Sequence, residues 1–331
     1  MRSRIFALLL VVVMVILAAC GSPTKEDVMK KLSGKWNEAK GYDLQATMEI
    51  KTGAEPRSYE VAVWHTKPAF YRVNVTQAGS KDSQMIVRNK EGVFVVTPSL
   101  GKTYKFQSDW PSQNSQAYLI GALSEDIKAD KNATMTEKEK TYVFETATRN
   151  NHKKVLPTQQ IHIDKKTLLP TYVSVLDENK VEKIRITFNK ITLGVERKAA
   201  DYAVDMDDTN TGKESEPAAT GLSTYYPSVA WADGTLVDEE IVNMDSGTRS
   251  FMTFAGEKEF IIVQEPAVRA DNKLPVSIEG DPVDLGFTVA ALTDNSIRWE
   301  SGGVSFFIAS DKLTQDELLE VAGSMEAGEM K

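Results

Sequence analysis

The stretch from Arg57 to Thr76 reads RSYEVAVWHTKPAFYRVNVT and decides the fold class. Side chains alternate between the two faces of a strand, so an apolar period of two predicts strands. Large apolar residues keep that period on both sides of Pro68: Tyr59, Val61 and Val63 before it, and Tyr71, Val73 and Val75 after it. The first strand also has Ala62 and Trp64 on its other face, where a half-wetted sheet would carry polar residues. We therefore expect a sheet that is covered on both faces, by helices or by a bound apolar ligand.

The same period continues from Tyr42 to about Asp205. It predicts eight or nine strands, most of them joined by short turns such as 97–101 and 177–180. Consecutive strands with short turns indicate an antiparallel meander and not βαβ units. Two helices are expected beside it: an amphipathic helix at 24–40 with Thr24 as its N-cap, and a second helix at 112–130.

A polar segment divides the mature chain in two. Residues 207–219 contain no large apolar residue and, with residue 220, predict a linker. Residues 20–206 then form one domain, and 221–331 form a smaller α+β domain. The smaller domain is expected to have strands at 251–254, 259–264, 287–292, 296–301 and 304–309, and a closing helix with a capping box formed by Thr314 and Glu317.

The first twenty residues predict export. Arg2 and Arg4 precede an apolar run at 5–17, and the run ends in Leu17-Ala18-Ala19-Cys20, the pattern of a bacterial lipobox. We expect residues 1–19 to be removed as a lipoprotein signal peptide and Cys20 to carry a lipid. The protein would then be anchored on the extracytoplasmic face of the cell membrane. There are two alternatives: an ordinary signal peptide in which Cys20 is incidental, and an uncleaved signal anchor.

Charge and cysteine content narrow the function classes. After loss of the two signal-peptide arginines, 37 basic residues face 47 acidic ones, a formal net charge of −10. Such a chain is not attracted to nucleic acid or to anionic lipid by its charge, so the membrane contact is expected to come from the lipid anchor. Cys20 is the one cysteine in the chain, which excludes an internal disulfide.

Catalytic and cofactor motifs are missing. His65, His152 and His162 have no metal-ligand spacing, and Gly101-Lys102-Thr103 sits in a predicted hairpin and not in a phosphate-binding loop. The acidic run Asp238-Glu239-Glu240 is interpreted as a solvated surface. We expect no catalytic residue, no metal and no cofactor, and hence a non-enzymatic binding protein. A hydrolase with paired carboxylates stays open as a distant alternative.

The residues from Val28 to about Asp207 resemble lipoprotein carriers of the LolA/LolB type. The resemblance rests on an N-terminal helix and strand (32–48), on Lys67-Pro68-Ala69-Phe70-Tyr71 after a strand, and on Asn89-Lys90-Glu91-Gly92 before an aromatic hairpin. It implies an incomplete antiparallel β-barrel wrapped over helices, with an apolar cavity for acyl chains. Periplasmic carriers have an arginine at the position of Lys67, where it latches a helical lid, so this chain departs from the family there.

The C-terminal part resembles a small domain of Gram-positive membrane lipoproteins and of some anti-sigma factors. The matching segments are Val283-Asp284-Leu285-Gly286, Ile297-Arg298-Trp299 with Gly302-Gly303, and Leu313 to Ala322. The whole combination resembles sporulation-associated lipoproteins of the YdcC type. It is also similar to two-domain regulators of envelope stress that bind a membrane partner.

Two functions follow. In the first, the half-barrel binds an acyl chain, a lipoprotein or another envelope ligand in a cavity lined by Trp64, Phe70, Tyr71, Phe94, Val96, Tyr104 and Phe106. In the second, the chain is a regulatory subunit that senses envelope state or sporulation and docks onto a membrane signalling protein. The ordinary alternative for the aromatic residues is a core in which the two helices cover one face and leave no room for a ligand.

Overall fold

The computed structural model describes residues 23–327, except for 52–55, 81–82, 108–115, 150–154, 205–223, 229–234, 245–246 and 271–273. The predicted signal peptide, Cys20, His152 and the linker at 207–220 lie outside the described residues, so the domain division stays a prediction. Within the described part of the chain, no helix has the length and apolar character needed to cross a bilayer.

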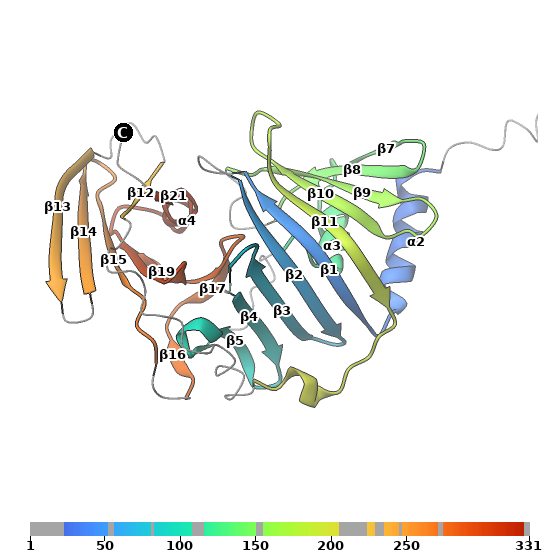
Figure 1. Cartoon of the computed structure of the whole chain (residues 1–331). Helices are drawn as coiled ribbons and strands as arrows, with labels where there is room; N and C mark the ends of the chain where they lie inside the picture. The colour runs from blue at the N-terminus through green and yellow to red at the C-terminus, as the bar shows by residue number, and fades with distance from the viewer. Residues whose placement is uncertain are drawn as a thin grey trace, which may run out of the picture.

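A large curved sheet forms the N-terminal half of the molecule (Figure 1). Its strand order is β16-β6-β5-β4-β3-β2-β1-β11-β10-β9-β8-β7, so its two edge strands do not meet and the barrel is incomplete. All pairs are antiparallel except β16 with β6, which is parallel. The strands are β1 Gly41–Ile50, β2 Arg57–Thr66, β3 Phe70–Gln77, β4 Ser83–Asn89, β5 Gly92–Thr97, β6 Lys102–Phe106, β7 Thr134–Glu137, β8 Thr141–Ala147, β9 Thr158–Asp164, β10 Pro170–Leu176, β11 Glu182–Leu193 and β16 Val276–Ile278.

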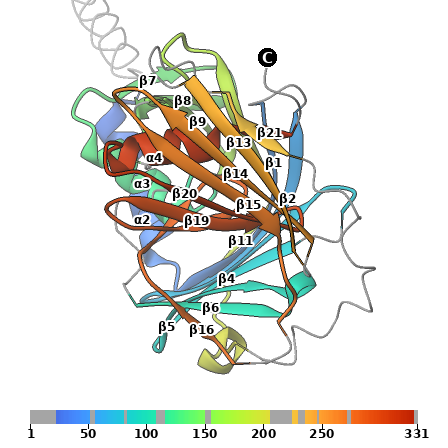
Figure 2. The ribbon, with the colours of Figure 1, turned by 90° about the vertical axis from the view of Figure 1, so that its left-hand side faces the viewer.

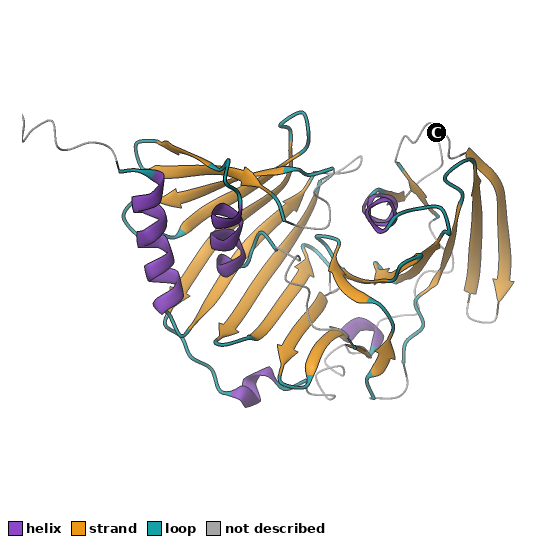
Figure 3. Ribbon diagram, turned by 180° about the vertical axis from the view of Figure 1, so that it is seen from behind, coloured by secondary structure: helices purple, strands orange, loops and turns teal. Residues whose placement is uncertain are grey.

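Two helices fill the concave face of this half-barrel (Figure 3). They are α2, Lys25–Glu38, and α3, Ile120–Ala129. Thr24 caps α2, because its hydroxyl accepts a hydrogen bond from the Asp27 amide at 3.1 Å. The helices bury apolar side chains against the alternate apolar residues of the strands in one core: Val28, Leu32, Ile120, Leu123 and Ile127 from the helices, and Val61, Val63, Val73, Phe144 and Ile161 from the strands.

The convex face has a smaller apolar cluster of its own. A 3₁₀ turn, η2 (Ala199–Tyr202), lies over it and buries Tyr202 completely. The Tyr202 and Thr66 hydroxyls are hydrogen-bonded at 2.8 Å, which ties the turn to β2. Strands that are apolar on both faces are therefore explained by α2 and α3 on one side and by η2 on the other.

The C-terminal half is a seven-stranded sheet in the order β13-β14-β15-β20-β19-β18-β17 (Figures 1 and 2). One face of it packs against α4, Gln315–Gly323, whose predicted capping box is confirmed by a 2.8 Å hydrogen bond from the Thr314 amide to Glu317. The strands are β13 Thr235–Met244, β14 Gly247–Ala255, β15 Phe260–Pro266, β17 Asp281–Asp284, β18 Val289–Leu292, β19 Ser296–Ser301 and β20 Val304–Ala309, and a short pair joins β12 Tyr225–Pro227 to β21 Met325–Ala327.

Strand β18 joins the two halves. Val289 and Ala291 point into the half-barrel core, while Ala290 and Leu292 point into the core under α4. All four side chains are buried, so this strand belongs to both cores. β16, which comes from the C-terminal half of the sequence, adds a strand to the half-barrel sheet beside β6.

The predicted fold class, an incomplete antiparallel β-barrel over helices with a smaller α+β part, is confirmed. The element bounds differ in places. The first helix ends at Glu38, and Gly41 begins β1 instead of ending the helix; within the described residues, the second helix begins at Ile120. β12, β13, β16, β17 and β21 were not predicted, and Asp238-Glu239-Glu240 lies in the middle of β13.

Candidate functional site

A groove lies between the half-barrel edge and the C-terminal sheet, and we call it the inter-sheet groove. It has a volume of about 280 Å³. Its lining combines apolar and charged side chains: Lys102 and Tyr104 of β6, Val276 and Ile278 of β16, Val263 and Glu265 of β15, Arg298 and Glu300 of β19, and Phe307 of β20. Ligand sites are commonly concave and lined by apolar side chains with a few charged groups, so this groove is the candidate site that the fold itself creates.

The charges of the groove largely neutralise one another. Lys102 forms an ion pair with Glu300 in which the two side chains are 17% and 8% exposed. Burial raises the pKa of Tyr104, and the nearby negative charge of Glu300 raises it further. Arg298 lies over the Phe307 ring, 5.2 Å from its centroid. The Lys102–Glu300 pair joins the two sheets, and Val263, Phe307 and Val276 remain as the apolar surface that a ligand could contact.

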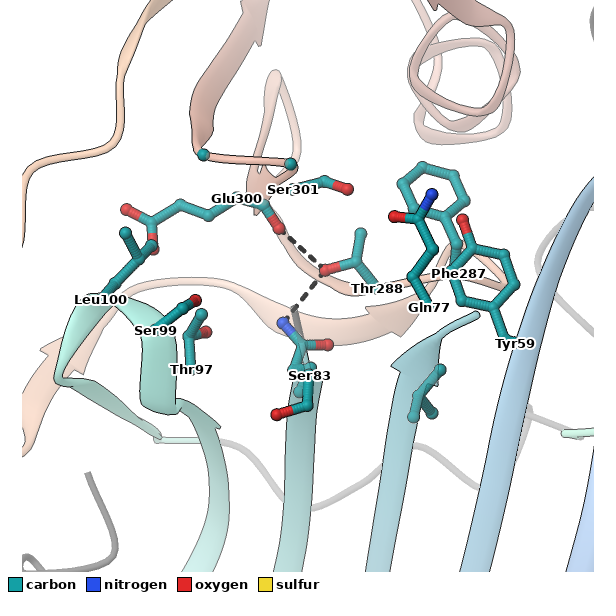
Figure 4. Close-up of a pocket in the computed structure, with 14 residues that line it drawn as sticks. Tyr59, Gln77, Ser83, Thr97, Ser99, Leu100, Phe287, Thr288, Glu300 and Ser301 are labelled. Carbon is teal, nitrogen blue, oxygen red and sulfur yellow. Dashed lines mark hydrogen bonds between the residues drawn. The ribbon is translucent and has the colours of Figure 1, made fainter. Parts of the chain in front are cut away.

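A second, smaller cavity lies on the other side of Glu300 (Figure 4). Gln84 of β4 is hydrogen-bonded to the C-terminal half there. Its side-chain amide donates to the Thr288 hydroxyl at 3.0 Å and accepts from the Val289 backbone amide at 2.8 Å. The cavity volume is about 50 Å³. That volume suits a water molecule, whereas an acyl chain needs a pocket of several hundred Å³.

The seven residues expected to line one cavity are divided between the two faces of the half-barrel. Trp64, Phe70, Phe94 and Val96 lie on the convex face, in the cluster under η2. Trp64 there stacks against the Arg197 guanidinium, 3.8 Å from the ring centroid, and Arg197 pairs with Asp43. These four residues are brought together, but they do not face the concave side that holds the helices.

The other three residues belong to the concave side. Phe106 is buried in the main core, and Tyr104 packs against that core and reaches the inter-sheet groove. Tyr71 alternates with the core residue Val73 along β3 and stacks on His65, with the ring centroids 4.2 Å apart. Tyr104 is thus the one predicted residue that lines the groove.

Lys67 contacts the N-terminal helix. Its ammonium group donates to the Asn37 carbonyl in the last turn of α2, and the Lys67-Pro68 peptide bond is cis. A cation is favourable at a helix C-terminus, where backbone carbonyls lack partners. Lys67 therefore ties the C-terminal end of α2 to the turn between β2 and β3.

The two described histidines have structural surroundings. The Nδ1 atom of His65 lies 3.0 Å from the Phe70 carbonyl oxygen. His162 stacks on Tyr172 with centroids 3.8 Å apart, and burial lowers its pKa to about 4. Among the described residues, no group of three or more His, Cys, Asp or Glu side chains is placed to hold a metal ion.

Asp284 of the C-terminal half forms a buried contact with the half-barrel, and we call this contact the Asp284 clasp. No pattern in the sequence indicates it. The Asp284 carboxylate accepts a hydrogen bond from the Gly286 amide at 2.8 Å and another from the buried Tyr118 hydroxyl, which precedes α3. Desolvation raises the pKa of Asp284 to about 6, although these donors act in the opposite direction. Residues 283–286 carried only a family resemblance, and nothing in the sequence pairs them with Tyr118.

This clasp predicts a pH dependence. The pKa of Asp284 is about 6 in the folded state, above the ordinary aspartate value of 3.8, so the native state binds its proton more tightly than the unfolded state does. Stability from this group is complete below pH 4 and is lost as the pH rises through 6, by on the order of 3 kcal/mol. Asp284→Asn should remove that slope and stabilise the protein at pH 7.

The measurement is the free energy of unfolding between pH 4 and pH 7. The lowered pKa of His162 produces the opposite slope in the same range, so the informative quantity is the difference between wild type and Asp284→Asn. Asp311→Asn, at an exposed position beyond β20, is the matched control. A difference that does not change with pH would contradict the assignment.

The comparisons with known proteins identify the family. The chain is 37% identical over 337 residues to the sporulation protein YdcC of Bacillus subtilis (strain 168), and the alignment covers 100% of this chain and 98% of that protein. The chain belongs to the YdcC-like family of sporulation proteins. The family model for YdcC-like sporulation proteins matches residues 1–196, so the resemblance to the YdcC type noted in the sequence is confirmed.

Two solved structures show remote likeness to this YdcC-like protein. The MucA/MucB complex of Pseudomonas aeruginosa includes a chain with 15% identity and a TM-score of 0.33, with 92% of this chain and 100% of that chain covered. The LolA superfamily protein NE2245 from Nitrosomonas europaea has 8% identity and a TM-score of 0.33, with coverage of 55% and 99%.

Proposed function

We propose that this YdcC-like protein is a lipid-anchored, non-enzymatic protein on the extracytoplasmic face of the membrane, where it docks a protein partner during sporulation. The observation that supports this proposal is the distribution of exposed apolar side chains. Of the nine large hydrophobic residues that are exposed in the described part, seven lie between Val237 and Val276. In the described residues, the exposed large apolar side chains are therefore concentrated in the C-terminal half of the sequence.

A photo-crosslinking experiment tests the docking proposal. A benzophenone side chain is placed at Ile261, which is 42% exposed on the C-terminal sheet, and for comparison at Val181, which is 51% exposed on the half-barrel. Crosslinks to one membrane protein are expected from position 261 and not from position 181. Equal crosslinking from both positions, or none from either, would reject the proposal.

The anchor supplies a separate prediction. Cys20→Ala should abolish incorporation of a fatty-acid analogue, since the chain has no other thiol to acylate. The variant should accumulate with residues 1–19 attached or be released from the membrane. Metabolic labelling followed by mass spectrometry of the N-terminus measures both effects. Ser22→Ala is the matched control and should be labelled like wild type; a wild-type protein that takes up no label would refute the anchor.

Acyl-chain binding in the half-barrel is the second candidate. One observation favours it: Phe287, Val289 and Ala291 of the C-terminal half pack against the half-barrel core. We call the part of the concave face that they cover the mouth. Movement of the C-terminal half away from the mouth would expose an apolar interior. Uptake of a fluorescent fatty acid by residues 21–331 tests it. Tyr104→Glu on the concave side should abolish uptake, and Trp64→Glu on the convex side should not. If wild type binds no such probe, this candidate fails.

A further inference from the structure

Strand β13 presents a free edge at the side of the molecule farthest from the half-barrel (Figure 1). It pairs with β14 from Thr235 opposite Ala255 to Met244 opposite Gly247, with one register shift that leaves Val237 without a partner on β14. No strand among the described residues pairs with its other side. The backbone donors and acceptors on that side are available to an added strand.

The edge lacks two of the usual protections against pairing. The ten residues Thr235–Met244 include no proline and no lysine or arginine. Val237, Ile241 and Met244 are 59%, 58% and 42% exposed. A long edge strand with exposed apolar side chains favours the addition of another strand.

The charges on β13 restrict what can pair with it. Register places Asp238 and Glu240 on the face that carries Phe251, and Glu239 on the opposite face, where its carboxylate accepts a hydrogen bond from the Tyr226 hydroxyl at 3.0 Å. The next exposed side chain on the face of Glu239 is Ile241. Cross-strand pairs of opposite charge are stabilising and like charges are destabilising.

We propose that β13 is a docking edge for an extended segment of a partner protein in which basic residues face Asp238 and Glu240 and apolar residues face Ile241. This inference rests on the proposed docking function and gives it a location and a partner chemistry. A second copy of the chain is a poorer occupant, because antiparallel pairing centred on the middle of β13 brings the two acidic runs together. Main-chain hydrogen bonds would supply the affinity, and the acidic run would select the partner.

Labelled ten-residue peptides test the proposal against the full chain in detergent micelles. One peptide alternates lysine and valine, a second alternates glutamate and valine, and a third repeats the first with alternate backbone amides N-methylated. Fluorescence anisotropy should detect binding of the first peptide, which has lysine and unmodified backbone amides, and of neither of the other two. N-methylation removes backbone donors, so the third peptide separates strand pairing from simple charge attraction.

Charge reversal gives the matched variants. Glu240→Lys should weaken binding of the lysine peptide by about threefold to tenfold and should strengthen binding of the glutamate peptide. Glu178→Lys, in an exposed turn of the half-barrel, makes the same change of net charge and should leave both affinities unchanged. Glu240 and Glu178 are both exposed, so neither substitution should change the fold, and circular dichroism of both variants should match wild type.

Several results would overturn β13 as the docking edge. One is that the lysine and glutamate peptides bind equally well, and another is that the N-methylated peptide binds as well as the unmethylated one. A third is that the chain has the mass of a dimer in solution and that Glu240→Lys changes this mass. If the Glu240→Lys variant crosslinks to the same membrane protein through position 261 as strongly as wild type does, β13 is rejected as the docking edge while the docking function stands. If wild type crosslinks to no membrane protein, the docking function itself fails, whatever the peptides do.

Discussion

Replacing Gly41 with alanine is expected to lower the free energy of unfolding by about 3 kcal/mol, because overpacking against rigid backbone is costly. A Cβ atom at this position would lie 2.3 Å from the His65 carbonyl oxygen and 2.3 Å from that of Val195. Both contacts are with backbone, so no side chain can rotate away. Gly41 begins the central strand β1, and its carbonyl also accepts a hydrogen bond from the Gly194 amide at 2.9 Å.

Chemical denaturation followed by circular dichroism measures the effect. Gly34→Ala in α2 is the matched control, because its Cβ would meet only the Glu38 carboxylate at 4.0 Å. In a helix interior alanine is favoured over glycine by up to about 1 kcal/mol, so this variant should be slightly more stable than wild type. A Gly41→Ala protein as stable as wild type would show that β1 and β2 are not held as tightly as their register implies.

The second large effect is expected at β18, where Val289→Asp should destabilise the protein by on the order of 4 kcal/mol, because it buries an unpaired charge. Val289 is 5% exposed and lies in the half-barrel core, and its amide donates to Gln84. The charge can reach water only if the C-terminal half moves away from the mouth. We therefore expect a lower thermal midpoint together with a larger radius of gyration in small-angle scattering.

Val268→Asp is the control for this experiment, since Val268 is 56% exposed. It should change stability by no more than about 0.5 kcal/mol, as surface substitutions usually do. The fatty-acid probe adds a functional reading: opening of the mouth should increase uptake if the half-barrel interior can accept an acyl chain. An unchanged radius with unchanged stability would mean that β18 does not join the two cores.

The local pattern of the sequence predicted most strands well. β19 and β20 have the predicted bounds, and Tyr59, Val61 and Val63 are buried on one face of β2 as their alternation indicates. Strand β13 was missed because TLVDEEIVNM has three consecutive acids and no apolar period of two. Its extended conformation is imposed by pairing with β14, which is a tertiary effect that strand propensity does not contain.

The candidate site was predicted less well. Alternation correctly separates Trp64 from Val63, but it does not say which face of a sheet becomes concave. That choice depends on where α2 and α3 pack, and it places Trp64, Phe70, Phe94 and Val96 outside and Tyr104 inside. Apart from Tyr104, the residues of the inter-sheet groove were not predicted, because the groove joins segments far apart in the chain: Lys102 and Glu300 are separated by 198 positions.

The sequence by itself determined the family, the antiparallel half-barrel with its helices, and the alternation that divides each strand into two faces, because these depend on motifs and on contacts between near neighbours. It also carries the predicted lipid anchor in residues 1–20. The tertiary structure was needed to show that β18 lies in both cores, that Asp284 meets Tyr118, and that β13 is an edge strand of the C-terminal sheet among the described residues. Those features arise from pairing between segments far apart in the chain, and no local pattern specifies such pairs.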